Sequence, residues 1–176
     1  MLMVLHWTRD MITTRLATAA DAPALAELFY RIDLHYFGPA RASRDASARY
    51  VRANLFQPHC GVQIMLAECQ GGAVGLASFS LLYPAPEYSG QLFMKDLFTL
   101  QEARGRGVGQ ALLKALAGLA VRHGCQRFDW TAERGNQAAL DFYLRAGARI
   151  VEDKLYFRID GAALRTFADM PARLAQ

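Results

Sequence analysis

Apolar positions recur along this 176-residue chain with two periods, one typical of strands and one typical of helices. Short apolar runs bounded by polar, Gly or Pro residues predict strands at 11–17, 62–69, 73–83, 91–100, 126–132 and 154–160. Leu25, Leu28 and Ile32 recur at helical spacing after Asp21, a cap residue, and Pro23, which suits a first turn. These features predict a first helix directly after the first strand.

Helical spacing recurs later in the chain as well. A second helix is predicted around 44–56, before Pro58, and a terminal helix at 162–175. A long helix that ends near Gly124 is predicted from Val108, Ala111, Leu112, Ala115, Leu116 and Leu119. A shorter helix, capped by Asn136 and closed by Gly147, is predicted from Leu140, Tyr143 and Leu144.

The order of these elements indicates an α/β fold with one mixed sheet. The turn QGG joins 62–69 to 73–83 as a hairpin, and 91–100, after the expected loop 84–90, completes an antiparallel meander. The long helix then joins 91–100 to 126–132 as a β-α-β crossover, which must be parallel. With no linker or repeat, we expect one domain over 11–176, preceded by a loose extension at 1–10.

Composition excludes several classes of partner. The chain is 53% hydrophobic with a net charge of +4, but it has no Lys/Arg run interleaved with aromatic residues, so we expect no nucleic-acid partner. No apolar stretch approaches the roughly 20 residues that span a bilayer, and the start lacks signal-peptide features, so we expect a cytoplasmic protein without a membrane partner. The cysteines Cys60, Cys69 and Cys125 form no C-x-x-C pair, and we expect no metal site.

The stretch EARGRGVGQALLKAL, residues 102–116, places three glycines directly before the long helix. A strand that runs through such a turn into a helix brings unpaired N–H groups and the positive helix end to one point, where anions bind. Gly109 is followed by Gln110, so this is no Walker loop, and the G-x-G-x-G spacing is not that of the dinucleotide fingerprint. The alternative is a turn that caps the helix and holds no ligand.

Two motifs resemble the signatures of the GCN5-related N-acetyltransferases (GNAT). Arg104, Gly107 and Gly109 resemble their R-x-x-G-x-G acetyl-CoA signature, and 134–149, RGNQAALDFYLRAGAR, resembles their N-x-x-A-x-x-F-Y-x-x-x-G-A signature. The resemblance spans about residues 12–160 and implies the GNAT acyltransferase fold. The subgroup it is most similar to is the diamine (spermidine/spermine) acetyltransferases, through MKDLFTL and LYFRID.

The resemblance implies how acetyl-CoA is held. Main-chain N–H groups of the glycine turn would bind its pyrophosphate, and these belong to Arg104, Gly105, Arg106, Gly107, Val108, Gly109 and Gln110. The pantetheine would lie along the preceding strand and bond to the main chain of Leu97, Phe98 and Thr99. Asn136 would contact the cofactor from the following helix.

Two residues are candidates for the proton transfers that acetyl transfer to an amine requires. Tyr143 matches the general acid of the family, and a phenol with a pKa near 10 can protonate a departing thiolate. The alternative for Tyr143 is an aromatic residue of the core. Asp96 lies among apolar neighbours and would handle the ammonium proton, or else accept structural hydrogen bonds; Glu133 is a reserve base, and Trp130 is expected to pack near the cofactor.

The sequence departs from the diamine subgroup at two places. Lys95 stands where the subgroup carries an acid, and residues 35–37, HYF, stand where the subgroup has a Tyr-Glu pair. A lysine disfavours polyamines and suits an amine that also carries an anionic group, unless strand alternation points Lys95 away from Asp96. We expect a homodimeric N-acetyltransferase acting on a primary amine of a small molecule. The alternatives are a protein lysine or N-terminal acetyltransferase and a non-catalytic acyl-CoA sensor.

Overall fold

The computed structural model describes residues 12–171, and these divide into two units, 12–133 and 134–171. The first unit is built on one five-stranded sheet in the order β1-β2-β3-β4-β5. Its strands are β1 Ile12–Leu16, β2 Gln63–Cys69, β3 Gly72–Ala85, β4 Ser89–Thr99 and β5 Cys125–Trp130. Neighbouring strands are antiparallel except β4 and β5, which are parallel. The predicted meander and crossover are therefore confirmed.

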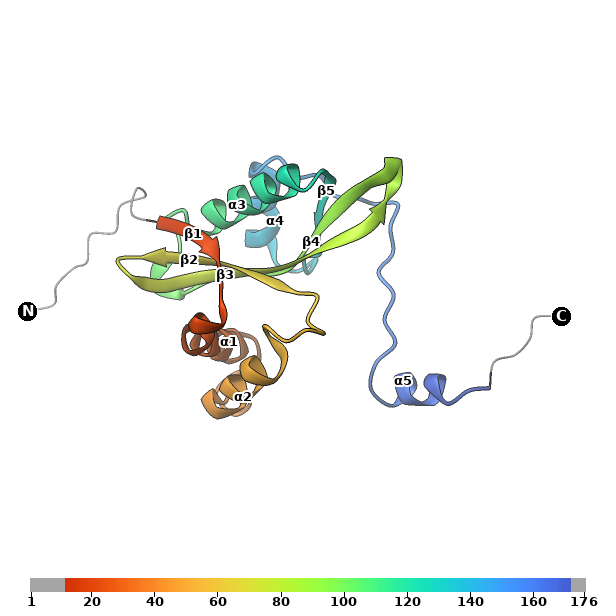
Figure 1. Cartoon of the computed structure of the whole chain (residues 1–176), viewed down its shortest axis with the longest axis horizontal. Coiled ribbons are helices and arrows are strands. Elements are labelled where there is room, and N and C mark those ends of the chain that lie inside the picture. Colours follow the sequence, from red (N-terminus) through yellow and green to blue (C-terminus); the bar gives the residue numbers. More distant parts are fainter. Residues whose placement is uncertain (1–11, 172–176) are drawn as a thin grey trace, which may run out of the picture. The chain divides into compact units, whose positions relative to one another are not determined.

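Three helices cover the two faces of this sheet (Figure 1). The helices α1 Ala22–Phe37 and α2 Arg44–Asn54 lie on one face, and α3 Val108–Arg122 lies on the other. The first face holds a core cluster of Leu25, Leu28, Val51, Leu55, Ile64, Leu66, Leu76 and Phe98. On the second face, α3 buries Val108, Leu112, Leu113, Leu116, Leu119 and Ala120. Both apolar stripes match the periodicity of the sequence.

Local sequence explains where these helices begin. Asp21 occupies the N-cap position of α1 without a side-chain hydrogen bond to the helix, whose first turn contains Pro23. Ser43 caps α2 by accepting a hydrogen bond from the Ala46 N–H at 3.3 Å. Asp21 also receives a 2.7 Å hydrogen bond from the Thr18 N–H and two from the Arg15 guanidinium. These bonds tie the end of β1 to the start of α1.

The stretch 84–90 is not the open loop that the sequence predicted. β3 continues to Ala85, a 3-10 turn occupies Pro86–Tyr88, and β4 begins at Ser89, which pairs with Ala85. Pairing thus extends to the tip of a tight hairpin, because the short turn supplies the reversal without a longer connection. No helix within residues 12–171 is long and apolar enough to cross a membrane.

The second unit contains α4 Gln137–Arg145 and α5 Gly161–Ala168. The predicted strand at 154–160 is wrong, because this segment joins no sheet in the structure, and Leu155, Tyr156 and Phe157 are exposed. A strand needs a hydrogen-bonded neighbour, which a local apolar pattern does not supply. The terminal helix ends at Ala168 rather than near 175, before Pro171, and residues 172–176 lie outside the described part. The predicted extension 1–10 also lies outside it.

Candidate active site

The glycine-rich turn joins β4 to the N-terminal end of α3. Gly105 and Gly107 have φ angles of 74° and 92°, a region that residues with a Cβ rarely adopt. A Cβ added at Gly105 would meet no atom within 4 Å, so the main chain there faces open space. Gly107 provides no side-chain cap, and the first turn of α3 carries no acidic residue. The positive end of the helix therefore borders an open space suited to an anion.

Basic side chains flank this turn. The Arg104 Nε donates a hydrogen bond to the main-chain oxygen of Thr99 at 3.4 Å, and Arg106 is an exposed residue. Glu102, the nearby acid, pairs with Arg31 of α1 at 3.1 Å. Because that carboxylate already has a cationic partner, the positive charge of the turn is not neutralised by it.

β4 has an open side next to the turn. β5 pairs with β4 only between Gly90 and Met94, whereas β3 pairs with β4 as far as Thr99. Leu97, Phe98 and Thr99 therefore have no strand on their β5 side within the described part of the first unit. An extended ligand segment can add there by main-chain hydrogen bonds, as a further strand would.

A β-bulge at Lys95 decides where Asp96 points. Met94 pairs with Phe79, but Asp96 pairs with Ser78, so one extra residue is inserted into β4 between these pairs. Ser78 also pairs with Ile64, which belongs to the core cluster beneath α1 and α2. Asp96 therefore lies on the α1/α2 face, whereas simple alternation from Met94 would have placed it on the α3 face.

Asp96 is held by a buried hydroxyl. Ser78, which is 2% exposed, donates a short hydrogen bond to the Asp96 carboxylate and accepts one from the Asp96 N–H at 3.1 Å. The Asp96 side chain remains 30% exposed. One hydroxyl thus fixes both the main chain of the bulge and the orientation of a carboxylate that solvent reaches.

Lys95 lies beside this carboxylate. Its Nζ is 3.4 Å from the Asp96 Oδ2, and its side chain is 70% exposed. Of the two alternatives for Lys95, simple alternation would have pointed it away from Asp96, and the bulge is what brings the two side chains together. The cation and the carboxylate form an exposed ion pair, which is weak and open to rearrangement when a charged ligand arrives.

The glycine Gly75 on β3 also positions the turn. A Cβ added there would lie 2.6 Å from the Phe98 carbonyl oxygen and 3.0 Å from the Val108 Cγ1. Any side chain at this position would push the end of β4 or the first residue of α3 away. Sequence reasoning missed both Gly75 and Ser78, although a glycine and a serine inside the apolar run AVGLASFSLLY were the available signal.

The second unit carries the second motif. The Asn136 side chain caps α4 by accepting a hydrogen bond from the Ala139 N–H at 3.1 Å, which confirms the predicted cap. Tyr143 is half-buried, and its ring centroid lies 5.3 Å from that of Phe142. Gly147 has a φ of 92° just beyond the helix, as the predicted helix end requires.

The first unit thus brings together the glycine turn, the open side of β4 and Asp96. Asn136 and Tyr143 lie in the second unit, and their contacts with acetyl-CoA stay predictions, as does the role of Asp96. Glu133 is exposed at the end of the first unit, and the Trp130 ring packs against Phe128 at 4.8 Å between centroids. Among the described residues, no group of three or more His, Cys, Asp or Glu side chains is arranged to hold a metal ion.

The sequence matches the acetyltransferase (GNAT) family over residues 25–148. The chain belongs to this family. The matched residues include both motifs and β4, and the match identifies the chain as an acetyltransferase.

Similar proteins include small-molecule acetyltransferases. A thialysine N-epsilon-acetyltransferase from Sus scrofa is 31% identical over 118 residues, which is 62% of this chain and 68% of that protein. An aminoglycoside N(6')-acetyltransferase type 1 from Klebsiella aerogenes is 31% identical over 133 residues, 74% of this chain and 86% of that protein. An integron cassette protein from the mobile metagenome of V. cholerae has a solved structure with a TM-score of 0.87 and 36% identity, covering 91% of this chain and 99% of that one.

Proposed function

We propose that this enzyme transfers the acetyl group of acetyl-CoA to a primary amine of a small molecule. The observation that carries the proposal is that one strand, β4, joins an anion-binding glycine turn, an open main-chain side and a partly exposed carboxylate. Acetyl transfer needs these three features to anchor the cofactor, align its pantetheine and manage the amine proton.

The residues of the first unit fit acetyl-CoA, which supplies the acetyl thioester when bound. Main-chain N–H groups from Gly105 to Gln110 hold the pyrophosphate at the positive end of α3. The main chain of Leu97, Phe98 and Thr99 aligns the pantetheine along the open side of β4. Asp96 accepts the proton of the acceptor ammonium, directly or through water, because an amine with a pKa near 10 is protonated at neutral pH.

The second motif supplies the remaining roles. Tyr143 donates its phenolic proton to the departing thiolate, for which a group with a pKa near 10 stays protonated at neutral pH. Asn136 contacts the cofactor with the part of its amide that does not cap α4. Both roles rest on the match of α4 to the second family motif.

The acceptor carries a carboxylate as well as the amine that is acetylated. Lys95 supports this class, because an ammonium 3.4 Å from Asp96 repels a polycation and attracts an anionic group. The Sus scrofa relative is named for thialysine, an amino acid of this kind, whereas the Klebsiella relative is named for aminoglycosides, which lack a carboxylate. We further propose a cytoplasmic homodimer without nucleic-acid or membrane partners; light scattering of the purified chain tests the dimer.

The test is an acceptor panel that detects free CoA released from acetyl-CoA. The panel contains thialysine, ornithine, spermidine, kanamycin and a lysine-containing peptide. We expect the amino acids to give the highest kcat/KM. Turnover on the peptide alone would assign the chain to protein acetylation, and no turnover with any acceptor would leave only an acyl-CoA sensor.

A separate measurement isolates cofactor binding. At acetyl-CoA concentrations near 100 times Kd, ligand linkage stabilises the fold by about 2.7 kcal/mol, which raises the melting temperature. Gly107→Val should abolish this shift. Gly124→Val is the matched control, because Gly124 has a similarly positive φ of 68° just beyond the C-terminal end of α3, the end opposite to the glycine turn. Equal shifts in both variants would contradict the proposed anion site.

A further inference from the structure

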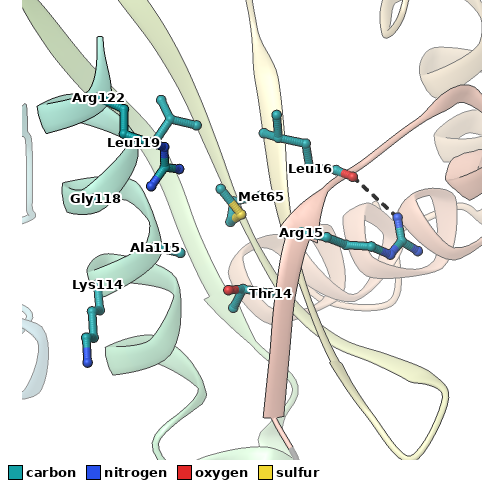
Figure 2. Close-up of a pocket in the computed structure, with 9 residues that line it drawn as sticks. All are labelled: Thr14, Arg15, Leu16, Met65, Lys114, Ala115, Gly118, Leu119 and Arg122. Carbon is teal, nitrogen blue, oxygen red and sulfur yellow. Dashed lines mark hydrogen bonds between the residues drawn. The ribbon is translucent and has the colours of Figure 1, made fainter. Parts of the chain in front are cut away.

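A groove of about 400 Å³ runs between the edge strand β1 and α3 (Figure 2). Its walls come from Thr14, Arg15, Leu16, Met65, Lys114, Ala115, Gly118, Leu119 and Arg122. Its volume falls within the range of small-molecule sites, about 300–1,000 Å³. The groove is distinct from the glycine turn, since Gly118 lies about 15 Å along the helix axis from Val108.

The groove combines an apolar surface with positive charge. Leu16, Met65, Ala115 and Leu119 form the apolar part, and Leu16 is 43% exposed even though it belongs to a strand. Among the described residues that line the groove, three are basic and none is acidic. Arg15 is already paired with Asp21 and Glu68, and its side chain points away from α3, so its charge does not serve the groove (Figure 2).

Arg122 supplies the charge that faces the groove. Its guanidinium lies over Gly118, where an added Cβ would be 3.4 Å from the Arg122 Nη1, and it is directed toward the space between α3 and β1 (Figure 2). Among residues 12–171, no side-chain hydrogen bond or ion pair joins the Arg122 guanidinium to another residue. A cation near the end of a helix is ordinary, but a glycine inside the helix costs about 1 kcal/mol relative to alanine. Gly118 thus keeps open the space into which the guanidinium is folded.

We propose that this groove binds a small carboxylate with a short apolar tail, at a site separate from the acyl transfer centre. The Arg122 guanidinium receives the carboxylate, for which its paired N–H donors are shaped. The Thr14 hydroxyl, which faces α3, adds a donor at the strand edge (Figure 2). The tail lies along Leu16 and Ala115 and shields the exposed part of Leu16 from water, since Met65 and Leu119 behind it are already buried.

The test is a titration of the full-length ¹⁵N-labelled protein with sodium octanoate, monitored by backbone amide shifts. We expect saturable shifts at Leu16, Gly118 and Leu119, and none at the glycine turn. Octylammonium has the same tail with the opposite charge, and it should shift none of these amides. Shifts confined to the glycine turn, or equal shifts with both probes, would overturn the proposal.

Two variants and one control locate the site. Arg122→Gln should raise the Kd for octanoate about tenfold, whereas Arg52→Gln, an equal loss of charge on α2, should leave it unchanged. Gly118→Leu fills the groove and favours the helix, so it should abolish binding in a protein that melts no lower than the wild type. An unchanged Kd for octanoate in Gly118→Leu would refute the proposed binding site. Binding of an acidic peptide without binding of octanoate would refute it as well.

Discussion

Replacing Ser78 with alanine tests whether its hydroxyl positions Asp96. The substitution removes one buried oxygen that serves two groups, the Asp96 carboxylate and the Asp96 N–H at 3.1 Å. Because Ser78 is 2% exposed, water does not readily replace the lost hydroxyl. The N–H is left without this partner, and the carboxylate is left with Lys95, whose Nζ lies 3.4 Å away.

The expected loss of stability follows from these contacts. Leaving a buried polar group unsatisfied costs about 1–3 kcal/mol, and the carboxylate recovers part of this through its exposed side. We therefore expect Ser78→Ala to lower the free energy of unfolding by about 1–2 kcal/mol. Each kcal/mol corresponds to a fall of about 2–4 °C in the melting temperature for a chain of this size. Ser80→Ala is the matched control, because Ser80 lies two residues further along β3 and donates only to the Gly61 carbonyl at 2.8 Å.

The kinetic assay separates positioning from folding. If Asp96 handles the amine proton, a reoriented carboxylate lowers kcat about tenfold or more, while the Kd for acetyl-CoA is unchanged because the glycine turn is intact. Ser78→Thr keeps the hydroxyl and should recover most of kcat. A wild-type kcat in Ser78→Ala would refute the positioning role, and a parallel loss of acetyl-CoA binding would show general disruption of β4 instead.

Three further substitutions test other parts of the argument. Tyr143→Phe should lower kcat by about 10²–10⁴-fold without changing acetyl-CoA affinity, and an unaltered kcat would return Tyr143 to a packing role. Lys95→Glu should raise kcat/KM for spermidine and lower it for thialysine, each about tenfold, whereas unchanged acceptor preference would place Lys95 outside the acceptor site. Hydrogen bonds from the Arg15 guanidinium, and then from the Thr18 N–H, hold the pKa of Asp21 well below its usual range. The contribution of Asp21 to the free energy of unfolding is therefore present above the unfolded pKa of about 3.9 and is lost as the pH falls through the folded pKa. In urea titrations Asp21→Asn should therefore cost about 1 kcal/mol at pH 7 and less near pH 2, and a constant difference would contradict the ion pair with Arg15.

Most elements of the first unit could be predicted from the sequence because their signals are local. The stripe from Val108 to Leu119 and the turn at Gln70–Gly71 depend on residues a few positions apart, and both appear where they were predicted. The segment 154–160 shows the limit of such signals. Its alternation of Leu155 and Phe157 with other residues suits a strand, but strand pairing depends on a distant main chain that the segment itself does not specify.

The candidate site was predictable only in part, for a related reason. The glycines of the turn indicate positive φ angles from the sequence alone, because a residue with positive φ is most often glycine. The bulge at Lys95 has no comparable signature, since it is an offset between two strands rather than a property of either one. Alternation read along β4 alone therefore left open whether Lys95 and Asp96 share a face.

The bulge at Lys95 lies between the part of β4 that pairs with β5 and the part proposed to bind the cofactor and hold the Asp96 carboxylate. Beyond Met94, β4 loses β5 as a neighbour, and at the same point the bulge turns Asp96 toward the α1/α2 face. A continuous regular strand would keep its side-chain alternation, and Asp96 would then share the α3 face with Met94. The extra residue thus lets Met94 lie on the α3 face while Asp96, the next paired residue, presents its carboxylate on the α1/α2 face, and the main chain from Leu97 to Thr99 stays open to the cofactor. Deleting Lys95 removes the extra residue but leaves Asp96 paired with Ser78 on the α1/α2 face, so turnover and the acetyl-CoA-dependent rise in melting temperature should both persist. Lost turnover with retained acetyl-CoA binding would show that the bulge itself, and not only the face that Asp96 occupies, sets the catalytic geometry.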